Sequence, residues 1–192
     1  MFKILFSLLF ITLNSFAVSA KIVATAGTEV ITSYDLETRI KLTKVLNPNY
    51  EKTNQAERSV VLDRLIQEKL LFSMATQNNL VLTETEIENA IKDVAKSNPN
   101  VKNISKNSPL YSSFIEQMKG EIIFSIILQS RLAGKLDFTE EEITRFKNSY
   151  NSQNDKKINN EQSKQILTSM KINEVQIELL KSLQENNLIE KK

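Results

Sequence analysis

Apolar residues along this chain recur mainly at helical spacing, with one early exception. Residues 21–32 alternate between apolar and polar side chains and are rich in β-branched residues, with Gly27-Thr28 between two short runs. This pattern predicts a β-hairpin. Thr32 then stands as an N-cap, with Asp35 at the third helical position. A helix is therefore predicted from there toward Val45, ending at residues 47–49.

Two further helices are predicted before residue 98. Residues 56–77 carry a broad apolar face, and Glu68 belongs to the polar face opposite. Leu71 and Met74 fall outside that apolar face, so they either make a second contact inside the domain or form an exposed patch for other polypeptides. Residues 83–86 form a capping box that starts the next helix.

The following segment predicts a loop and then a long helix. Residues 98–107 are polar, and we expect them to be mobile. Ser108-Pro109 combines an N-cap with a proline at the first helical position. The helix expected from there to about Lys135 is the most apolar of the set. Gly120 costs about 1 kcal/mol relative to Ala in a helix interior, which a close crossing by a neighbouring helix would explain.

The C-terminal part predicts helices and a closing strand. A capping box at residues 139–142 opens a helix to Tyr150, and residues 151–160 have no apolar period, which is typical of a linker. Two helices are expected at about 161–170 and 173–185. Leu188-Ile189 is expected to pair with the N-terminal hairpin, because a lone hairpin is marginally stable. The predicted fold is mainly α with a small β-sheet, comprising a helical domain at residues 21–150 that residues 161–192 complete.

The N-terminus predicts an export signal. Lys3 precedes an apolar run at residues 4–13, and Val18-Ser19-Ala20 suits cleavage after Ala20. The competing interpretation is an uncleaved membrane anchor. That run is shorter than the ~20 residues that a spanning helix needs. We therefore expect a soluble periplasmic protein that begins at Lys21 and has no stable membrane insertion.

Composition excludes several kinds of chemistry. The chain has no His and no Cys, which removes Ser-His-Asp and Cys-His catalytic sites and the usual zinc sites. A net charge of +2 does not provide the strongly basic surface that is typical of nucleic-acid-binding proteins. Acidic clusters at residues 84–88 and 140–142 could hold a cation or act as acid and base, but each lies at a predicted helix start, where the helix dipole favours acidic residues. No cofactor, metal or enzymatic activity is expected.

The order of these elements resembles the SurA family of periplasmic folding helpers. The segment VLDRLIQEKLLFSMATQNNLVLTETEIENAIKDVAK is similar to the second and third helices of SurA-type N-domains. MKGEIIFSIILQSRL resembles the fourth helix of the family, LDFTEEEI the segment leading out of it, and the tail after residue 162 its C-terminal helices and strand. The positions that carry the second and third helices of the resemblance are Val81, Thr83, Glu86, Ile87, Ala90, Ile91, Val94 and Ala95.

The resemblance implies a fold like the SurA N-domain and the C-terminal domain of trigger factor. It also implies a shallow crevice that binds unfolded polypeptides, outer-membrane protein precursors among them, without ATP. In the family, parvulin-type prolyl isomerase domains are inserted where this chain has the polar linker at residues 151–160, which is too short to hold a domain. We therefore expect a holdase without isomerase activity. The alternative is an envelope adaptor that uses the same fold for one fixed partner.

The long apolar helix supplies the candidate peptide-binding residues. It carries more apolar surface than one packing partner normally covers. The other interpretation is that these side chains are ordinary core, since large apolar residues are usually buried. The candidates are Tyr111, Phe114, Ile115, Met118 and Phe124.

Overall fold

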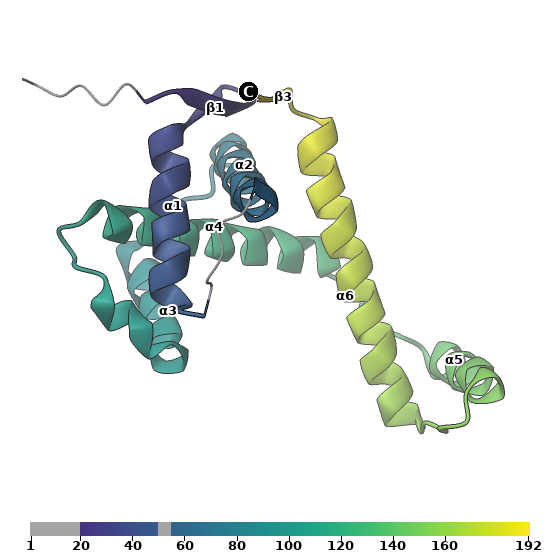
Figure 1. Cartoon of the computed structure of the whole chain (residues 1–192). Coiled ribbons are helices and arrows are strands. Elements are labelled where there is room, and N and C mark those ends of the chain that lie inside the picture. The colour runs from purple at the N-terminus through teal and green to yellow at the C-terminus, as the bar shows by residue number, and fades with distance from the viewer. Residues whose placement is uncertain (1–19, 50–54) are drawn as a thin grey trace, which may run out of the picture.

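A computed structural model describes residues 20–49 and 55–192. The predicted signal segment therefore lies outside the described residues, except for Ala20. The described chain is mainly α with a small antiparallel sheet of order β2-β1-β3 (Figure 1). Its elements are β1 (Ile22–Ala26), β2 (Glu29–Thr32), α1 (Ser33–Leu46), α2 (Gln55–Gln77), α3 (Glu84–Ser97), the 3-10 helix η1 (Pro99–Asn103), α4 (Pro109–Leu132), α5 (Glu140–Gln153), α6 (Asn160–Glu185) and β3 (Ile189–Lys191).

The predicted hairpin and closing strand are both present. Strands β1 and β2 pair antiparallel around Gly27, whose φ of 61° lies in the left-handed region that glycine tolerates. Strand β3 pairs with β1 on its other side, with Ala26 opposite Ile189. The chain ends are joined further by hydrogen bonds from the Gly27 amide to the Leu188 carbonyl and from the Lys192 amide to the Val23 carbonyl, each 2.9 Å long.

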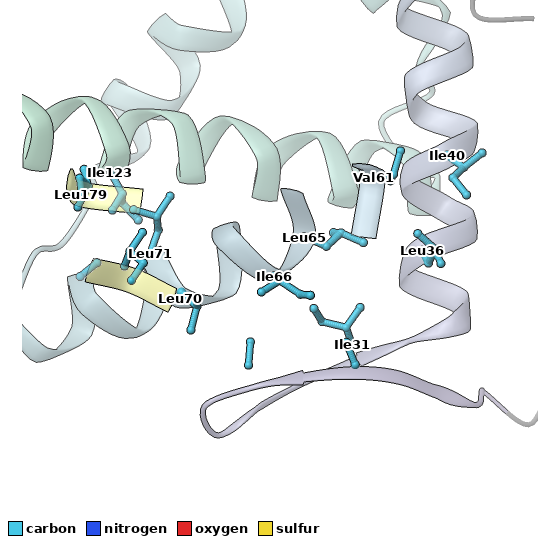
Figure 2. Close-up of a cluster of buried hydrophobic side chains, with 14 residues drawn as sticks. Ile31, Leu36, Ile40, Val61, Leu65, Ile66, Leu70, Leu71, Ile123 and Leu179 are labelled. Atoms are coloured by element: carbon cyan, nitrogen blue, oxygen red, sulfur yellow. The ribbon is translucent and has the colours of Figure 1, made fainter. Parts of the chain in front are cut away.

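The main core lies between this sheet and the helices. Ile31 points from the hairpin toward Leu65 and Ile66 of α2, as Figure 2 shows. Ala24 and Ala26 are fully buried on the inner face of β1, where small side chains leave room for helices to pack closely. Leu71 is buried and Met74 packs against the same core, so the interpretation of an internal contact is confirmed for both.

A second core joins the end of α1 to α3, η1 and the start of α4. Its buried members are Leu42, Ile104, Phe114 and Met118. Residues 98–107, predicted to be mobile, are fixed by this cluster through the buried side chain of Ile104. The side-chain amides of Asn98 and Asn100 also donate to the Leu46 carbonyl, at 3.0 and 3.3 Å. The polar composition of the segment therefore serves specific hydrogen bonds, and the prediction of a mobile loop was wrong.

The C-terminal helices differ from the prediction. Residues 161–185 belong to one continuous helix, α6, with no break near Asn173. Its first half packs against α5, away from the sheet, while its second half packs on the main core (Figure 1). The apolar residues of the two halves fall on different sides of the helix, since each residue advances by about 100°. This change of face resembled a helix boundary in the sequence.

The segment predicted as a linker is shorter and more ordered than expected. Helix α5 continues to Gln153, which leaves residues 154–159 as the connection. The Asn151 side chain accepts from the Ile158 amide at 2.8 Å and donates to the Ile158 carbonyl at 3.0 Å, and Ile158 itself is buried. The connection is therefore a fixed turn. That it stands in place of an inserted domain stays a prediction.

Three predicted helix starts are capping boxes in the structure. They begin at Thr32, Thr83 and Thr139. In each, the threonine hydroxyl accepts a hydrogen bond from the backbone N–H of the third helical residue, and the side-chain carboxylate of that residue accepts one from the threonine backbone N–H. Hydrogen bonds from Thr83 hold the pKa of the Glu86 carboxyl below its usual value, and bonds from Thr139 do the same for the pKa of Glu142. These carboxylates are thus engaged in helix capping.

Deleting residues 187–192 should lower thermal stability. The deletion removes β3, the packing of Ile189 on the core and the Lys191–Asp63 ion pair at 2.6 Å. We expect a loss of about 2 kcal/mol from the hydrogen bonds and partial burial, which corresponds to a melting temperature lower by roughly 4–8 °C. The control is Leu188→Ser, because Leu188 is 72% exposed. A truncated chain that melts with the full chain in calorimetry would refute the closing role of β3.

Candidate functional site

Three helices meet at a buried polar network. Arg39 of α1 and Glu68 of α2 are each 5% exposed and form a two-point ion pair, with Nη1–Oε2 at 2.8 Å and Nη2–Oε1 at 2.9 Å. The Arg39 guanidinium also donates from Nε to the Ser113 hydroxyl of α4 at 2.9 Å and from Nη2 to the Ser113 carbonyl at 3.2 Å. The network therefore fixes α1, α2 and α4 relative to one another.

Glu68 corrects a prediction from the sequence. It was placed on the polar face of its helix, yet the structure buries it, because Arg39 compensates the charge. The single glycine inside α4 explains how Glu68 fits. A Cβ at Gly120 would lie 3.0 Å from the Glu68 Cγ, tighter than most Cβ contacts in proteins, so the Glu68 side chain would have to shift slightly. The expected close approach at Gly120 is thus present, and it is made by the Glu68 side chain.

A pocket of about 650 Å³ lies beside this network, within the size range of ligand sites. Helices α1, α2, α4 and α6, which surround the centre of Figure 1, form its walls. Its apolar wall residues come from all four helices, and its polar ones include several side-chain amides. The principal lining residues are Arg39, Val61, Gln67, Glu68, Leu71, Gln117, Gly120, Phe124, Gln176 and Leu180.

Helical spacing explains which side of α4 faces this pocket. The lining residues Gln117, Gly120, Glu121 and Phe124 are separated by three or four positions, so they share one side of the helix. The pocket lies between helices α1, α2 and α4 and the C-terminal helix α6. Gly120 was the signal in the sequence that marked this side of α4. Arg39 was not singled out, because a lone arginine on a helix is usually solvated.

The five sequence-predicted residues separate into three groups. Phe124 lines the pocket and is partly buried. Phe114 and Met118 are 0% and 2% exposed at the centre of the second core, so neither lies on the surface. Tyr111 packs at the edge of that core, and Ile115 is half-buried. The structure therefore brings one candidate into the pocket, and peptide binding by the set stays a prediction.

A second pocket of about 520 Å³ lies on the other side of the network. It is lined largely by hydroxyl and charged side chains from α1, α2 and the start of α4, among them Thr38, Lys69, Ser112 and Glu116. Ser113 lines this pocket, whereas Arg39 and Glu68 line the first. The lining of this pocket exposes less apolar area than that of the first pocket, so the first pocket is the stronger candidate for binding an unfolded chain.

Comparison with known families shows to which family the chain belongs. A family model described as the SurA N-terminal domain matches residues 19–127, more than half of the chain. This chain belongs to the SurA N-terminal domain family. The SurA match includes α1, α2, α3 and most of α4, and so three of the four helices that line the pocket; α6 lies beyond it.

Relatives named Chaperone SurA support the same assignment. The protein of Chromohalobacter salexigens is 25% identical over 134 residues, which covers 66% of this chain and 31% of the relative. That of Methylobacillus flagellatus is 28% identical and covers 70% and 33%, and that of Hydrogenovibrio crunogenus is 28% identical and covers 76% and 36%. The chain thus spans about a third of the length of these SurA relatives.

Two kinds of feature, a membrane-spanning helix and a metal-binding cluster, are not found in the described part of the chain. Among the helices formed by residues 20–49 and 55–192, none is both long and apolar enough to cross a bilayer. Within the same residues, no group of three or more acidic side chains is arranged to hold a metal ion.

Replacing one partner of the Arg39–Glu68 pair should lower the stability of the fold far more than replacing both. Glu68→Leu alone leaves Arg39 buried without its counter-charge, so we expect a loss of 3–5 kcal/mol, the approximate range for such changes. Arg39→Met with Glu68→Leu should recover most of that loss. As a control, Arg58→Met removes the exposed Arg58–Glu37 pair between the same two helices and should cost less than about 1 kcal/mol. Urea unfolding measures all three; a double variant as unstable as the single one would contradict the account.

Proposed function

We propose that this chain is a holdase-type chaperone of the periplasm that binds unfolded polypeptides, outer-membrane protein precursors among them, without prolyl isomerase activity. The observation that carries the proposal is the pocket between α1, α2, α4 and α6 in a chain of the SurA N-terminal domain family. Relatives that match it carry the name Chaperone SurA.

The walls of the pocket suit an unfolded chain on physical grounds. Phe124 and Leu180, which are only partly buried, offer apolar area to client side chains, and burial contributes about 25 cal/mol per Å² of apolar surface removed from water. Side-chain amides such as those of Gln67 and Gln176 both donate and accept hydrogen bonds, so they can bind a main chain of any sequence. Weak, sequence-tolerant binding of this kind needs no ATP for release.

Pocket variants should weaken the suppression of aggregation. We expect Phe124→Ser with Leu180→Ser to keep the fold, since both side chains are only partly buried, and to lose most of the protection of an outer-membrane β-barrel protein diluted from urea, followed by light scattering. The matched controls are Val60→Ser on α2 and Ile177→Ser on α6, which are 50% and 56% exposed. Full protection by the folded double variant would contradict the proposal, as would cross-linking to a single stoichiometric partner.

Prolyl isomerisation should proceed at its uncatalysed rate. The chain contains no His and no Cys, whereas parvulin sites in the family it resembles are built with His and with Cys or Asp, and residues 154–159 alone connect α5 to α6. Residues 21–192 added to a proline-containing test peptide should leave the rate of cis–trans exchange unchanged. A rate above background that follows the protein through a further purification step would overturn this part of the proposal.

A further inference from the structure

The Arg39–Glu68 pair retains hydrogen-bonding capacity. A guanidinium carries five N–H groups, and Arg39 uses one at Nε, two at Nη2 and one at Nη1 in bonds to Glu68 and Ser113. One N–H of Nη1 therefore has no acceptor among the described residues. The Glu68 carboxylate accepts one bond from Arg39 at each oxygen, which leaves further lone pairs.

This capacity lies at the pocket. Arg39, Glu68 and Gly120 all line it. A Cβ at position 120 would lie 3.6 Å from Glu68 Oε2, the oxygen that is paired with Nη1. Because Gly120 has no Cβ, the backbone of α4 lies close to the Glu68 side chain, and both residues contribute to the pocket lining. A spare donor and a spare acceptor thus stand next to each other, on atoms 2.8 Å apart.

Stability alone does not explain a charged pair in this position. Buried ion pairs lose most of their attraction to desolvation, and apolar replacements of similar volume are often as stable. A donor beside an acceptor is, however, the arrangement that a β-strand presents to its neighbour, where one residue exchanges both an N–H and a C=O bond. Extended peptides are commonly bound through such main-chain bonds.

We propose that the Arg39–Glu68 pair is the main-chain anchor of the pocket. Arg39 Nη1–H donates to a carbonyl oxygen of the bound client, and Glu68 Oε2 accepts the amide N–H of the same client residue. This inference rests on the proposed function and adds how the pocket holds chains of unrelated sequence. The anchor contacts only main-chain atoms of the client, and the apolar side chains of Phe124 and Leu180 contact the side chains of the client.

An ester scan of a client peptide tests the anchor. A fluorescent peptide from an outer-membrane β-strand is bound to the full chain, and each amide in turn is replaced by an ester, which removes one N–H with little change in shape. Fluorescence anisotropy should show a loss of affinity of about tenfold or more at one or two adjacent positions, as for a lost hydrogen bond to a charged group. Esters that bind like the parent peptide at every position would overturn the inference.

Variants of the chain test whether the ester penalty arises from Arg39 and Glu68. Arg39→Met with Glu68→Leu should bind the parent peptide about tenfold more weakly and lose the ester penalty, because both anchor groups are gone. Glu37→Leu with Arg58→Met removes the exposed pair between the same two helices and should retain wild-type affinity and penalty. A penalty that persists unchanged in the Arg39/Glu68 variant would refute the anchor.

A second variant tests the anchor independently if the Arg39/Glu68 variant does not fold. Gly120→Ala places a Cβ against Glu68 Cγ and should reduce both the affinity and the ester penalty, and unchanged values in folded protein would also refute the anchor. The outcomes separate the two proposals. A wild-type chain that binds no unfolded peptide contradicts the proposed function, whereas binding without any ester penalty contradicts only the anchor.

Discussion

The buried bond between Arg39 and Glu68 is the constraint on which the arrangement of the helices depends. Two charges removed from water must satisfy each other with good geometry, and here the hydroxyl and the carbonyl of Ser113 accept two further hydrogen bonds from Arg39. Because Arg39 and Glu68 come from α1 and α2, a displacement of either helix would leave a buried charge without its partner, and a displacement of α4 would break the bonds from Arg39 to Ser113.

Both cores and both pockets are organised around that junction. The main core lies on the side of the sheet and the second core on the side of α3, and the residues of the network line both the 650 Å³ pocket and the smaller 520 Å³ pocket. The glycine of α4 belongs to the same arrangement, since it accommodates the Glu68 side chain, and both residues line the pocket. One set of contacts therefore fixes the fold and shapes the site.

Local signals in the sequence were sufficient for most elements, and nonlocal contacts account for the rest. Capping threonines located the starts of α1, α3 and α5, and the alternation around Gly27 located the hairpin. The burial of Glu68 and Phe114 depends on partners 29 or more residues away, such as Arg39 and Leu42, which helical periodicity does not reveal. For the same reason, the change of packing face along α6 resembled two helices, and Ile104 was not expected to fix the loop around it.

The position of β3 has a consequence for the order in which the fold can form. The central strand of the sheet, β1, comes from the first residues of the described chain, and its second neighbour comes from residues 189–191. The sheet cannot be completed until synthesis has passed residue 191. Contacts between segments so distant in sequence also form slowly. Until then, β1 can pair with β2, but the edge of β1 that receives β3 stays unpaired, so the sheet and the core beneath it are completed only after the C-terminal residues have been made.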